Sequence, residues 1–130
     1  VLATREMQKH SAPDLIWRRI GFFQFKGMKA DADVYELIGK GSEVDRESQP
    51  WRTTFNKALN EFSQRRFKEA MELFIETNTL RKRPENEVFK DLDGRLVNDG
   101  PAKFYMDWIE TNADEQLRSD WTGEIALDKK

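Results

Sequence analysis

The sequence predicts an α+β fold that is mainly α, and three observations lead to this prediction. An aromatic and β-branched run at residues 15–25 and a shorter apolar run at 34–38 flank a polar connection, 26–31. Aromatic and β-branched residues bounded by glycine and aspartate favour strands over a helix. Beyond Trp51, apolar residues recur instead at helical spacing. We therefore expect an antiparallel strand pair followed by a helical region.

Two consecutive helices are expected at residues 51–64 and Phe67–Leu80, because each carries an apolar stripe at spacings i, i+3, i+4 and i+7. The polar turn at 63–66 is short enough to force the two helices into an antiparallel hairpin. Pro84 ends the helical run. The stripes are formed by Phe55, Ala58, Leu59 and Phe62 in the first helix and by Phe67, Ala70, Met71 and Phe74 in the second.

A third helix is expected to begin at residues 98–101, Asn-Asp-Gly-Pro, because proline suits the first helical position and aspartate or glycine the position before it. An aromatic stripe follows, formed by Phe104, Tyr105, Trp108 and Ile109. This stripe can cover the helical hairpin and complete a three-helix unit. For residues 85–98, a short β-hairpin turned at Asp93-Gly94 and a broken helical turn both remain open. Residues 121–127 predict a final short strand.

The composition limits the classes of function. The chain has 130 residues, which is one domain or one small domain plus a fragment. Charged residues make up 35% of it but the net charge is only −2, so we expect no nucleic-acid partner. The absence of cysteine excludes disulfides and thiolate chemistry. No apolar run approaches the roughly 20 residues of a membrane span. We expect no membrane contact by this segment and a cytoplasmic location.

Two motifs in the first forty residues carry a family resemblance. Residues 25–29 read Phe-Lys-Gly-Met-Lys and residues 33–39 read Asp-Val-Tyr-Glu-Leu-Ile-Gly. In this order they resemble the end of the catalytic domain of class III adenylate/guanylate cyclases. Before them, residues 1–4 and 5–10 look like the strand and the short helix that precede these motifs in the family. A departure is Asp31-Ala32-Asp33, which stands where the family has a Pro-Val pair.

The later part resembles the segment that follows the catalytic domain in bacterial members of this family. Its helical hairpin is similar to a tetratricopeptide-type unit, although a single unit is too few for a repeat array. Residues 99–105, Asp-Gly-Pro-Ala-Lys-Phe-Tyr, and residues 121–125, Trp-Thr-Gly-Glu-Ile, resemble two further family segments. Residues 85–97 depart from the pattern as an insertion.

The resemblance implies a domain division and an activity. Residues 1–41 would be the C-terminal strands of an incomplete cyclase catalytic domain, 42–50 a linker, and 51–130 a tetratricopeptide-like helical appendage with a short terminal strand. The parent protein would be an adenylate (or guanylate) cyclase, a phosphorus–oxygen lyase that converts ATP to cyclic AMP and pyrophosphate in signal transduction. It would act as a homodimer through the cyclase part and use Mg²⁺ or Mn²⁺. This segment alone would be inactive and hold no cofactor, because the family's metal ligands lie upstream.

Lys26 is the one candidate site residue. In the resembled family the first lysine of this motif reaches the nucleotide triphosphate across the dimer interface, so the resemblance implies a substrate-binding role for Lys26 in the intact enzyme only. An ammonium group at a strand end suits a phosphate cluster. The alternative is a solvated turn lysine, which is also what we expect of Lys29. No catalytic residue and no metal ligand is assigned to this segment.

A second function class remains open: a non-catalytic protein-interaction module attached to a degenerate cyclase domain, with a protein partner on the helical appendage. The remaining chemical groups favour ordinary surface roles. We expect His10 to be a surface residue and the basic run at 81–83 to be a charge cluster at a helix end. Asp91-x-Asp93-Gly94 lacks the longer carboxylate series of a calcium loop. The choice between ATP and GTP, an upstream sensor and an upstream membrane anchor lie outside this segment.

Overall fold

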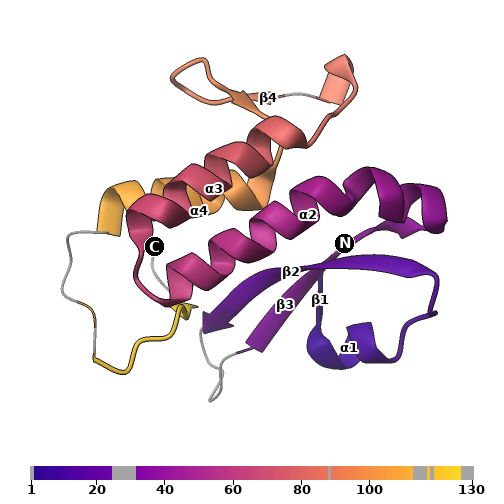
Figure 1. Ribbon diagram of the computed structural model, residues 1–130, viewed down its shortest axis with the longest axis horizontal. Helices are drawn as coiled ribbons and strands as arrows, with labels where there is room; N and C mark the ends of the chain where they lie inside the picture. The colour runs from indigo at the N-terminus through magenta and orange to yellow at the C-terminus, as the bar shows by residue number, and fades with distance from the viewer. Residues whose placement is uncertain (1, 25–31, 88, 113–116, 118, 127–130) are drawn as a thin grey trace. The chain divides into compact units, whose positions relative to one another are not determined.

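Two long strands, β2 (Leu15–Gln24) and β3 (Ala32–Lys40), pair antiparallel and form the centre of a small sheet (Figure 1). This pairing confirms the strand pair expected from the two apolar runs. The computed structural model describes residues 2–24, 32–87, 89–112, 117 and 119–126. The connection between the two strands, residues 25–31, lies outside the described residues.

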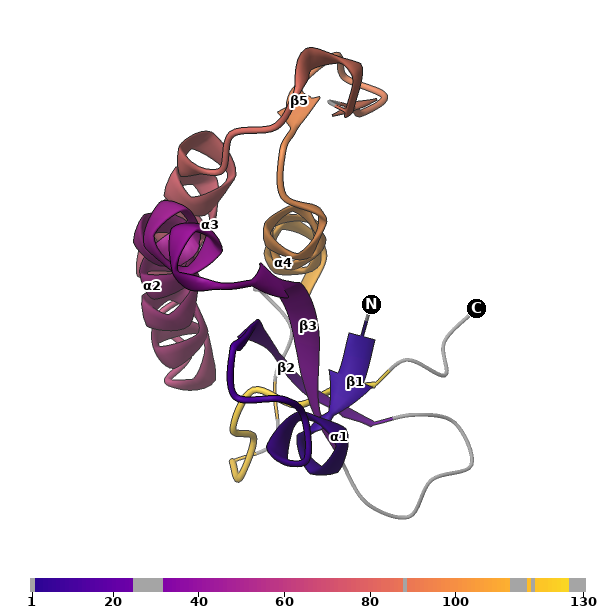
Figure 2. The ribbon, with the colours of Figure 1, turned by 90° about the vertical axis from the view of Figure 1, so that its right-hand side faces the viewer.

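Three short elements complete the sheet unit (Figure 2). Strand β1 (Leu2–Thr4) pairs antiparallel with β3, and β6 (Ile125–Ala126) pairs parallel with β2 on the other side. The strand order is therefore β1-β3-β2-β6. Helix α1 (Arg5–Lys9) follows β1 directly. Its first turn is capped by the Thr4 side chain, which accepts a hydrogen bond from the Met7 amide at 3.5 Å.

The last strand belongs to the sheet unit and not to the helical appendage that we expected at 51–130. The chain divides into one compact unit made of Val1–Gln49 with Arg118–Lys130 and another made of Pro50–Leu117. The physical reason is main-chain pairing, because Ile125 lies opposite Phe23 in the register and is itself buried. A short strand carries too little sequence signal to reveal such a long-range partner.

Residues 42–50, expected as a linker, are helical and form the first part of helix α2 (Ser42–Ser63). The division between the two compact units falls within this stretch, between Gln49 and Pro50. The helix begins where the Gly41 carbonyl accepts a hydrogen bond from the Asp45 amide at 3.1 Å. Glu43 and Asp45 lie in its first turn, where negative charge is favourable. Pro50 lies inside the helix and has no amide hydrogen to donate. That proline, together with the polar composition, made the segment resemble a linker.

The turn from β3 into α2 depends on two glycines. Gly41 has φ +95°, in the left-handed region where a side chain is strained. At Gly39, an added Cβ would lie 2.9 Å from Cγ1 of Val44. A side chain at either position would therefore disturb the start of α2.

Helices α3 (Phe67–Leu80) and α4 (Gly100–Asn112) confirm the second and third helices expected from the sequence. Together with the later part of α2 they enclose an aromatic core. The rings of Phe74 and Tyr105 are stacked, with centroids 4.8 Å apart and an interplanar angle of 4°. Phe62 meets Tyr105 edge-on at 4.9 Å and Trp108 at 5.0 Å. The aromatic stripe of α4 therefore covers the helical hairpin, as expected.

Residues 85–97 combine the two structures that the sequence left open. A short 3₁₀ turn, η1 (Glu85–Glu87), comes first. Strands β4 (Phe89–Lys90) and β5 (Leu96–Val97) then form an antiparallel hairpin. Gly94 in its turn has φ +80°, which glycine adopts without strain.

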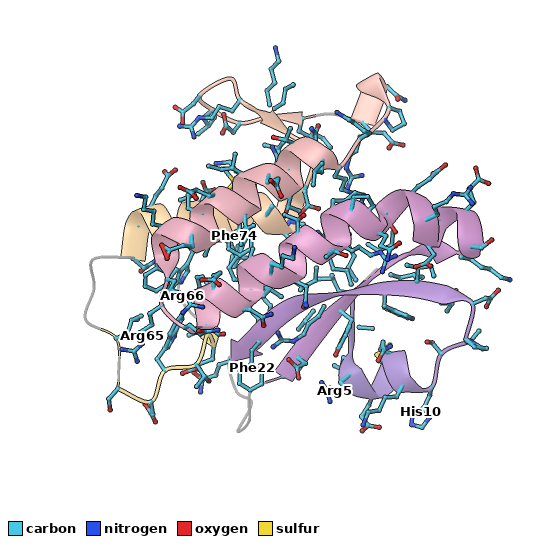
Figure 3. The ribbon with its side chains drawn as sticks, viewed as in Figure 1. Arg5, His10, Phe22, Arg65, Arg66 and Phe74 are labelled. Atoms are coloured by element: carbon cyan, nitrogen blue, oxygen red, sulfur yellow. The ribbon has the colours of Figure 1, made fainter. Side chains whose placement is uncertain are left out.

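The turn between α2 and α3 is closed by backbone hydrogen bonds of the Schellman type. The Arg66 amide donates to the Glu61 carbonyl at 3.0 Å. The Arg65 amide donates to the Phe62 carbonyl, also at 3.0 Å. This geometry needs a residue in the left-handed conformation, and Arg65 supplies it with φ 65°. Figure 3 labels Arg65 and Arg66 in this turn. The Arg66 side chain forms an ion pair with the Glu61 carboxylate. Hydrogen bonding within this pair lowers the pKa of Glu61 and raises that of Arg66.

Replacing Arg65 with glycine is expected to stabilise the protein. The left-handed conformation costs a residue with a side chain about 1–2 kcal/mol, so Arg65→Gly should raise the free energy of unfolding by about 0.5–1 kcal/mol after the chain-entropy cost of glycine. Urea unfolding followed by circular dichroism measures this. Lys57→Gly, at an exposed position inside α2, is the control and should lower stability by about 1 kcal/mol. Equal destabilisation by the two variants would contradict the role assigned to Arg65.

Candidate functional site

The structure describes the two strand ends that flank the expected site residue, while Lys26 itself lies outside the described residues, as does Lys29. On β2, the last described residues are Phe23, which is buried, and Gln24, which is exposed. On β3, Ala32 and Asp33 lie opposite Phe23 and Phe22. The paired strand ends thus hold the two ends of the connection that contains Lys26.

A cluster of three charged side chains lies beside these strand ends. Oδ1 of Asp33 accepts a hydrogen bond from Nε of Arg19 at 2.8 Å and lies 2.7 Å from the Nη2 atom of the same guanidinium. Nε of Arg5, on α1, lies 3.6 Å from Oδ2 of Asp33. Figure 3 labels Arg5 on α1 and Phe22 on β2. Because two guanidinium groups meet one carboxylate, the cluster has a net charge of +1, a sign that suits a phosphate group.

A second ion pair, between Arg18 on β2 and Glu36 on β3, is structural. The two residues lie opposite each other in the register, and Nη2 of Arg18 donates to the Glu36 carboxylate. The Arg18 side chain is almost completely buried. A buried charge of this kind is tolerated only with a partner, so the pair helps to fix the register of β2 against β3.

The Asp-Gly-Pro motif has a structural role in the helical unit. Asp99 is completely buried, and its Oδ2 accepts a hydrogen bond from the Ala102 amide at 3.1 Å, which caps the start of α4. Its Oδ1 accepts a hydrogen bond from Nη1 of Arg81 at 2.7 Å. The Arg81 guanidinium also lies 4.3 Å from the ring centroid of Trp51. Arg81, expected as part of a solvated helix-end cluster, instead joins α2, α3 and α4.

Asn78 connects the same region to the β4–β5 hairpin, and sequence reasoning missed it. Its side-chain oxygen accepts hydrogen bonds from the amides of Asn98 and Asp99, at 2.8 and 2.9 Å. Its side-chain nitrogen donates to the Leu96 carbonyl at 3.1 Å. An asparagine in the last turn of a helix is a common residue, and its partners are about twenty positions away. The sequence pattern therefore gave no signal for this role.

Asp91 organises the turn of the hairpin and does not resemble a calcium ligand. Its Oδ1 accepts hydrogen bonds from the amides of Asp93 and Arg95, both at 2.9 Å. The other carboxylate oxygen lies 3.3 Å from Nζ of Lys103. The hydrogen bond from the Arg95 amide, helped by Lys103, lowers the pKa of Asp91. Among the residues that the structure describes, no three histidine, cysteine, aspartate or glutamate side chains are grouped to hold a metal ion.

The remaining candidate groups have ordinary surroundings. His10, labelled in Figure 3, ends α1 with an exposed side chain. Its Nε2 lies 3.5 Å from the Glu6 carboxylate. Within the described part of the chain, no helix combines the length and hydropathy needed to cross a membrane.

Comparison with known proteins adds no relative, because no family model, curated protein or solved structure matches the chain. Among the described residues, the Arg5–Asp33–Arg19 cluster combines two guanidinium groups with one carboxylate, and its net positive charge suits an anionic ligand.

Removing the Asp99 carboxylate is expected to be strongly destabilising. Asp99→Ala would leave the largely buried Arg81 without its anionic partner and α4 without its cap, so the free energy of unfolding should fall by about 3–5 kcal/mol. Thermal unfolding followed by circular dichroism measures the loss. Asp107→Ala removes an exposed partner of Lys103 and should cost at most about 1 kcal/mol. A similar small loss in both variants would show that the buried network contributes little.

The turn of the β4–β5 hairpin should lose stability only at a pH below the usual titration range of aspartate, because the pKa of Asp91 is lowered. Because the folded-state pKa of Asp91 is lowered, its stabilising effect is complete above the ordinary value of 3.8 and is lost as the pH falls through the lower folded value. NMR titration of the Asp93 and Arg95 amides should show a transition below pH 3.8. Asp91→Asn should abolish that transition. A midpoint at or above the ordinary value would contradict the hydrogen bonding assigned to this carboxylate.

Proposed function

We propose that the chain is the C-terminal part of a class III nucleotidyl cyclase that converts ATP to cyclic AMP and pyrophosphate. The observation that carries the proposal is the order of β1, α1, β2 and β3, with β2 and β3 antiparallel on either side of residues 25–31. This is the order that the lysine-glycine motif and its flanking segments imply.

Lys26 would bind the triphosphate in the intact enzyme. In cyclic AMP formation the ribose 3′-oxygen bonds to the α-phosphorus and the bond to the pyrophosphate oxygen breaks, so negative charge grows on the departing pyrophosphate. An ammonium group stabilises that charge more in the transition state than in the bound substrate. Mg²⁺ or Mn²⁺, held by upstream residues, would supply further charge neutralisation. The positive Arg5–Asp33–Arg19 cluster on the neighbouring elements would favour the approach of a polyanion.

The helical unit would have a regulatory role, supporting the homodimer or binding a protein partner. Its described residues include no group that resembles a phosphoryl-transfer site, whereas its buried side chains form an aromatic core and a capping network. A cytoplasmic location is part of the same proposal, since ATP is the substrate.

A non-catalytic interaction module on a degenerate cyclase domain is the second candidate. It is favoured by large apolar side chains on the surface of the helical unit, notably Phe89, Leu92 and Leu96. Such exposure suits protein binding more than catalysis. The two candidates differ in the sequence upstream of residue 1, because a cyclase needs metal-binding carboxylates there and an interaction module does not.

Lys26→Ala is expected to reduce cyclase activity of the full-length gene product by about 100-fold, the usual effect of removing one group that stabilises transition-state charge. The rate of cyclic nucleotide formation from ATP or GTP with Mn²⁺ or Mg²⁺ measures it. Lys29→Ala, which removes the same charge three positions away, should change the rate by less than about threefold if that lysine is solvated.

Three outcomes separate the candidates. An equal loss of cyclase activity in both variants would show that the total positive charge of residues 25–31 matters, and that Lys26 has no specific role. Full activity of the Lys26→Ala variant would support the cyclase function and show that Lys26 is a solvated turn lysine with no role in substrate binding. No product from a folded dimeric wild-type protein, under any of these conditions, would favour the interaction module.

A further inference from the structure

The dipeptide Asp-Gly occurs twice in the sequence, at residues 93–94 and at residues 99–100. It is a reactive link, because glycine has no Cβ to hinder attack of its backbone nitrogen on the side chain before it. The first copy lies in the turn of the β4–β5 hairpin, which projects from the helical unit in Figures 1 and 2. The second lies at the start of α4. The same chemistry is therefore under two different constraints in one chain.

The Asp93 side chain is accessible and weakly restrained. It is 72% exposed, and one of its carboxylate oxygens lies 3.5 Å from Nη2 of Arg95, whose side chain is 58% exposed. An ion pair between two exposed groups restrains them little. Among the described residues, no hydrogen bond to the Asp93 carboxylate accompanies this contact. Its Cγ atom can therefore turn toward the backbone nitrogen of Gly94.

Gly94 presents that nitrogen without steric hindrance. Its φ is +80°, and no atom lies within 4 Å of the place where a Cβ would stand. The Gly94 amide donates to the Asp91 carbonyl at 3.0 Å, and this bond must break before the nitrogen can attack. The turn residues 92–95 are all exposed. Opening such a turn costs little free energy, because few buried contacts close it.

At the second copy, the fold holds the carboxylate in place. Asp99 is completely buried, its Oδ1 accepts a hydrogen bond from Nη1 of Arg81 at 2.7 Å, and its Oδ2 accepts one from the Ala102 amide at 3.1 Å. Rotation of its Cγ toward the Gly100 nitrogen would break both bonds and separate the carboxylate from Arg81, which is costly in a buried pair. Reaction at Asp99 therefore requires the start of α4 to unfold.

We propose that Asp93 is a modification site that isomerises spontaneously to isoaspartate. In the neutral form of its carboxyl group, the Gly94 nitrogen bonds to Cγ, the C–OH bond breaks, and water leaves with the amide hydrogen. Water then opens the resulting succinimide. Addition at Cγ restores aspartate, whereas addition at the main-chain carbonyl carbon gives isoaspartate, whose main chain runs through Cβ. Water is lost once and gained once, so the composition is unchanged and no oxidant is needed.

The product would change the hairpin locally. It adds one carbon to the main chain within the turn and leaves a free α-carboxylate beside it. Oδ1 of Asp91 bonds the amides of Asp93 and Arg95, both at 2.9 Å, and the longer chain no longer fits both bonds. The side chain of Asn78 still holds Leu96 farther along the hairpin. This inference does not depend on the cyclase proposal.

The free α-carboxylate also defines the kind of enzyme that would act on the product. A methyltransferase specific for isoaspartate esterifies this group with the methyl group of S-adenosylmethionine, and an ordinary aspartate has no such group in its side chain. The exposed turn leaves the product accessible to an enzyme of this class.

Incubation of the folded chain in ¹⁸O-labelled water, at neutral pH and below its unfolding temperature, tests the proposal. Each succinimide cycle retains one oxygen of the incoming water. Trypsin cleaves after Lys90, Arg95 and Lys103, so the two Asp-Gly sites fall on separate peptides. The peptide with Asp93 should gain ¹⁸O and accumulate isoaspartate, identified by mass spectrometry and by methyl transfer with a purified isoaspartyl methyltransferase. The peptide with Asp99 should react at least about tenfold more slowly.

The unfolded chain and two substitutions are the controls. In concentrated urea, where the fold no longer protects Asp99, the two sites should react within about threefold of each other. Asp93→Glu keeps the charge but requires a larger ring, so isoaspartate should be absent from that peptide. Asp93→Asn replaces the departing water with ammonia, a better leaving group in this reaction, and should give isoaspartate at least about tenfold faster. Because the position is exposed, circular dichroism should show unchanged folding in both variants.

Three results would overturn the proposal. One is a folded wild-type chain that forms no isoaspartate at Asp93 while the unfolded chain does. Another is equal reaction of the two Asp-Gly sites in the folded chain. The third is an Asp93→Glu variant whose hairpin peptide forms as much isoaspartate as that of the wild type.

Discussion

The antiparallel pairing of β2 with β3 is the constraint on which the sheet unit depends. β1 has β3 as its partner and β6 has β2, so neither short strand could form a ladder without the central pair. The pairing also brings Arg18 to Glu36 and Arg19 to Asp33 across the strands. This pairing also sets Phe23 opposite Ala32, next to the two ends of the lysine-containing connection.

The helical unit has a corresponding constraint in the buried Asp99 carboxylate. It begins α4, accepts a hydrogen bond from Arg81 at the end of α3, and so fixes the two helices that enclose the aromatic core. A motif that resembles a family signature therefore has a local physical explanation. Desolvation of the two groups offsets much of their attraction, so the pair is most costly when only one partner is removed.

Much of the fold could be predicted because its signals are local. The apolar stripe of Phe67–Leu80 and the Asp-Gly-Pro start of α4 are periodic or capping patterns, and both helices occur where the sequence placed them. The failures arise from interactions over a long distance in sequence. The pairing of Ile125 with Phe23 and the contacts of Asn78 with residues 96–99 have no local pattern. The start of α2 at Ser42 was missed for a different reason, because a proline among polar residues has the same local pattern inside a helix as in a linker.

The candidate site was predictable only in part. The strands on either side of Lys26 follow from aromatic and β-branched composition, whereas the Arg5–Asp33–Arg19 cluster requires the β-sheet register and the position of α1.

The most direct test of the functional account is to incubate the full-length wild-type gene product with ATP and Mn²⁺ and to identify the products by mass spectrometry. The account predicts cyclic AMP and pyrophosphate in equal amounts. Unchanged ATP with a folded, dimeric protein, or ADP and phosphate in place of the cyclic product, would contradict it.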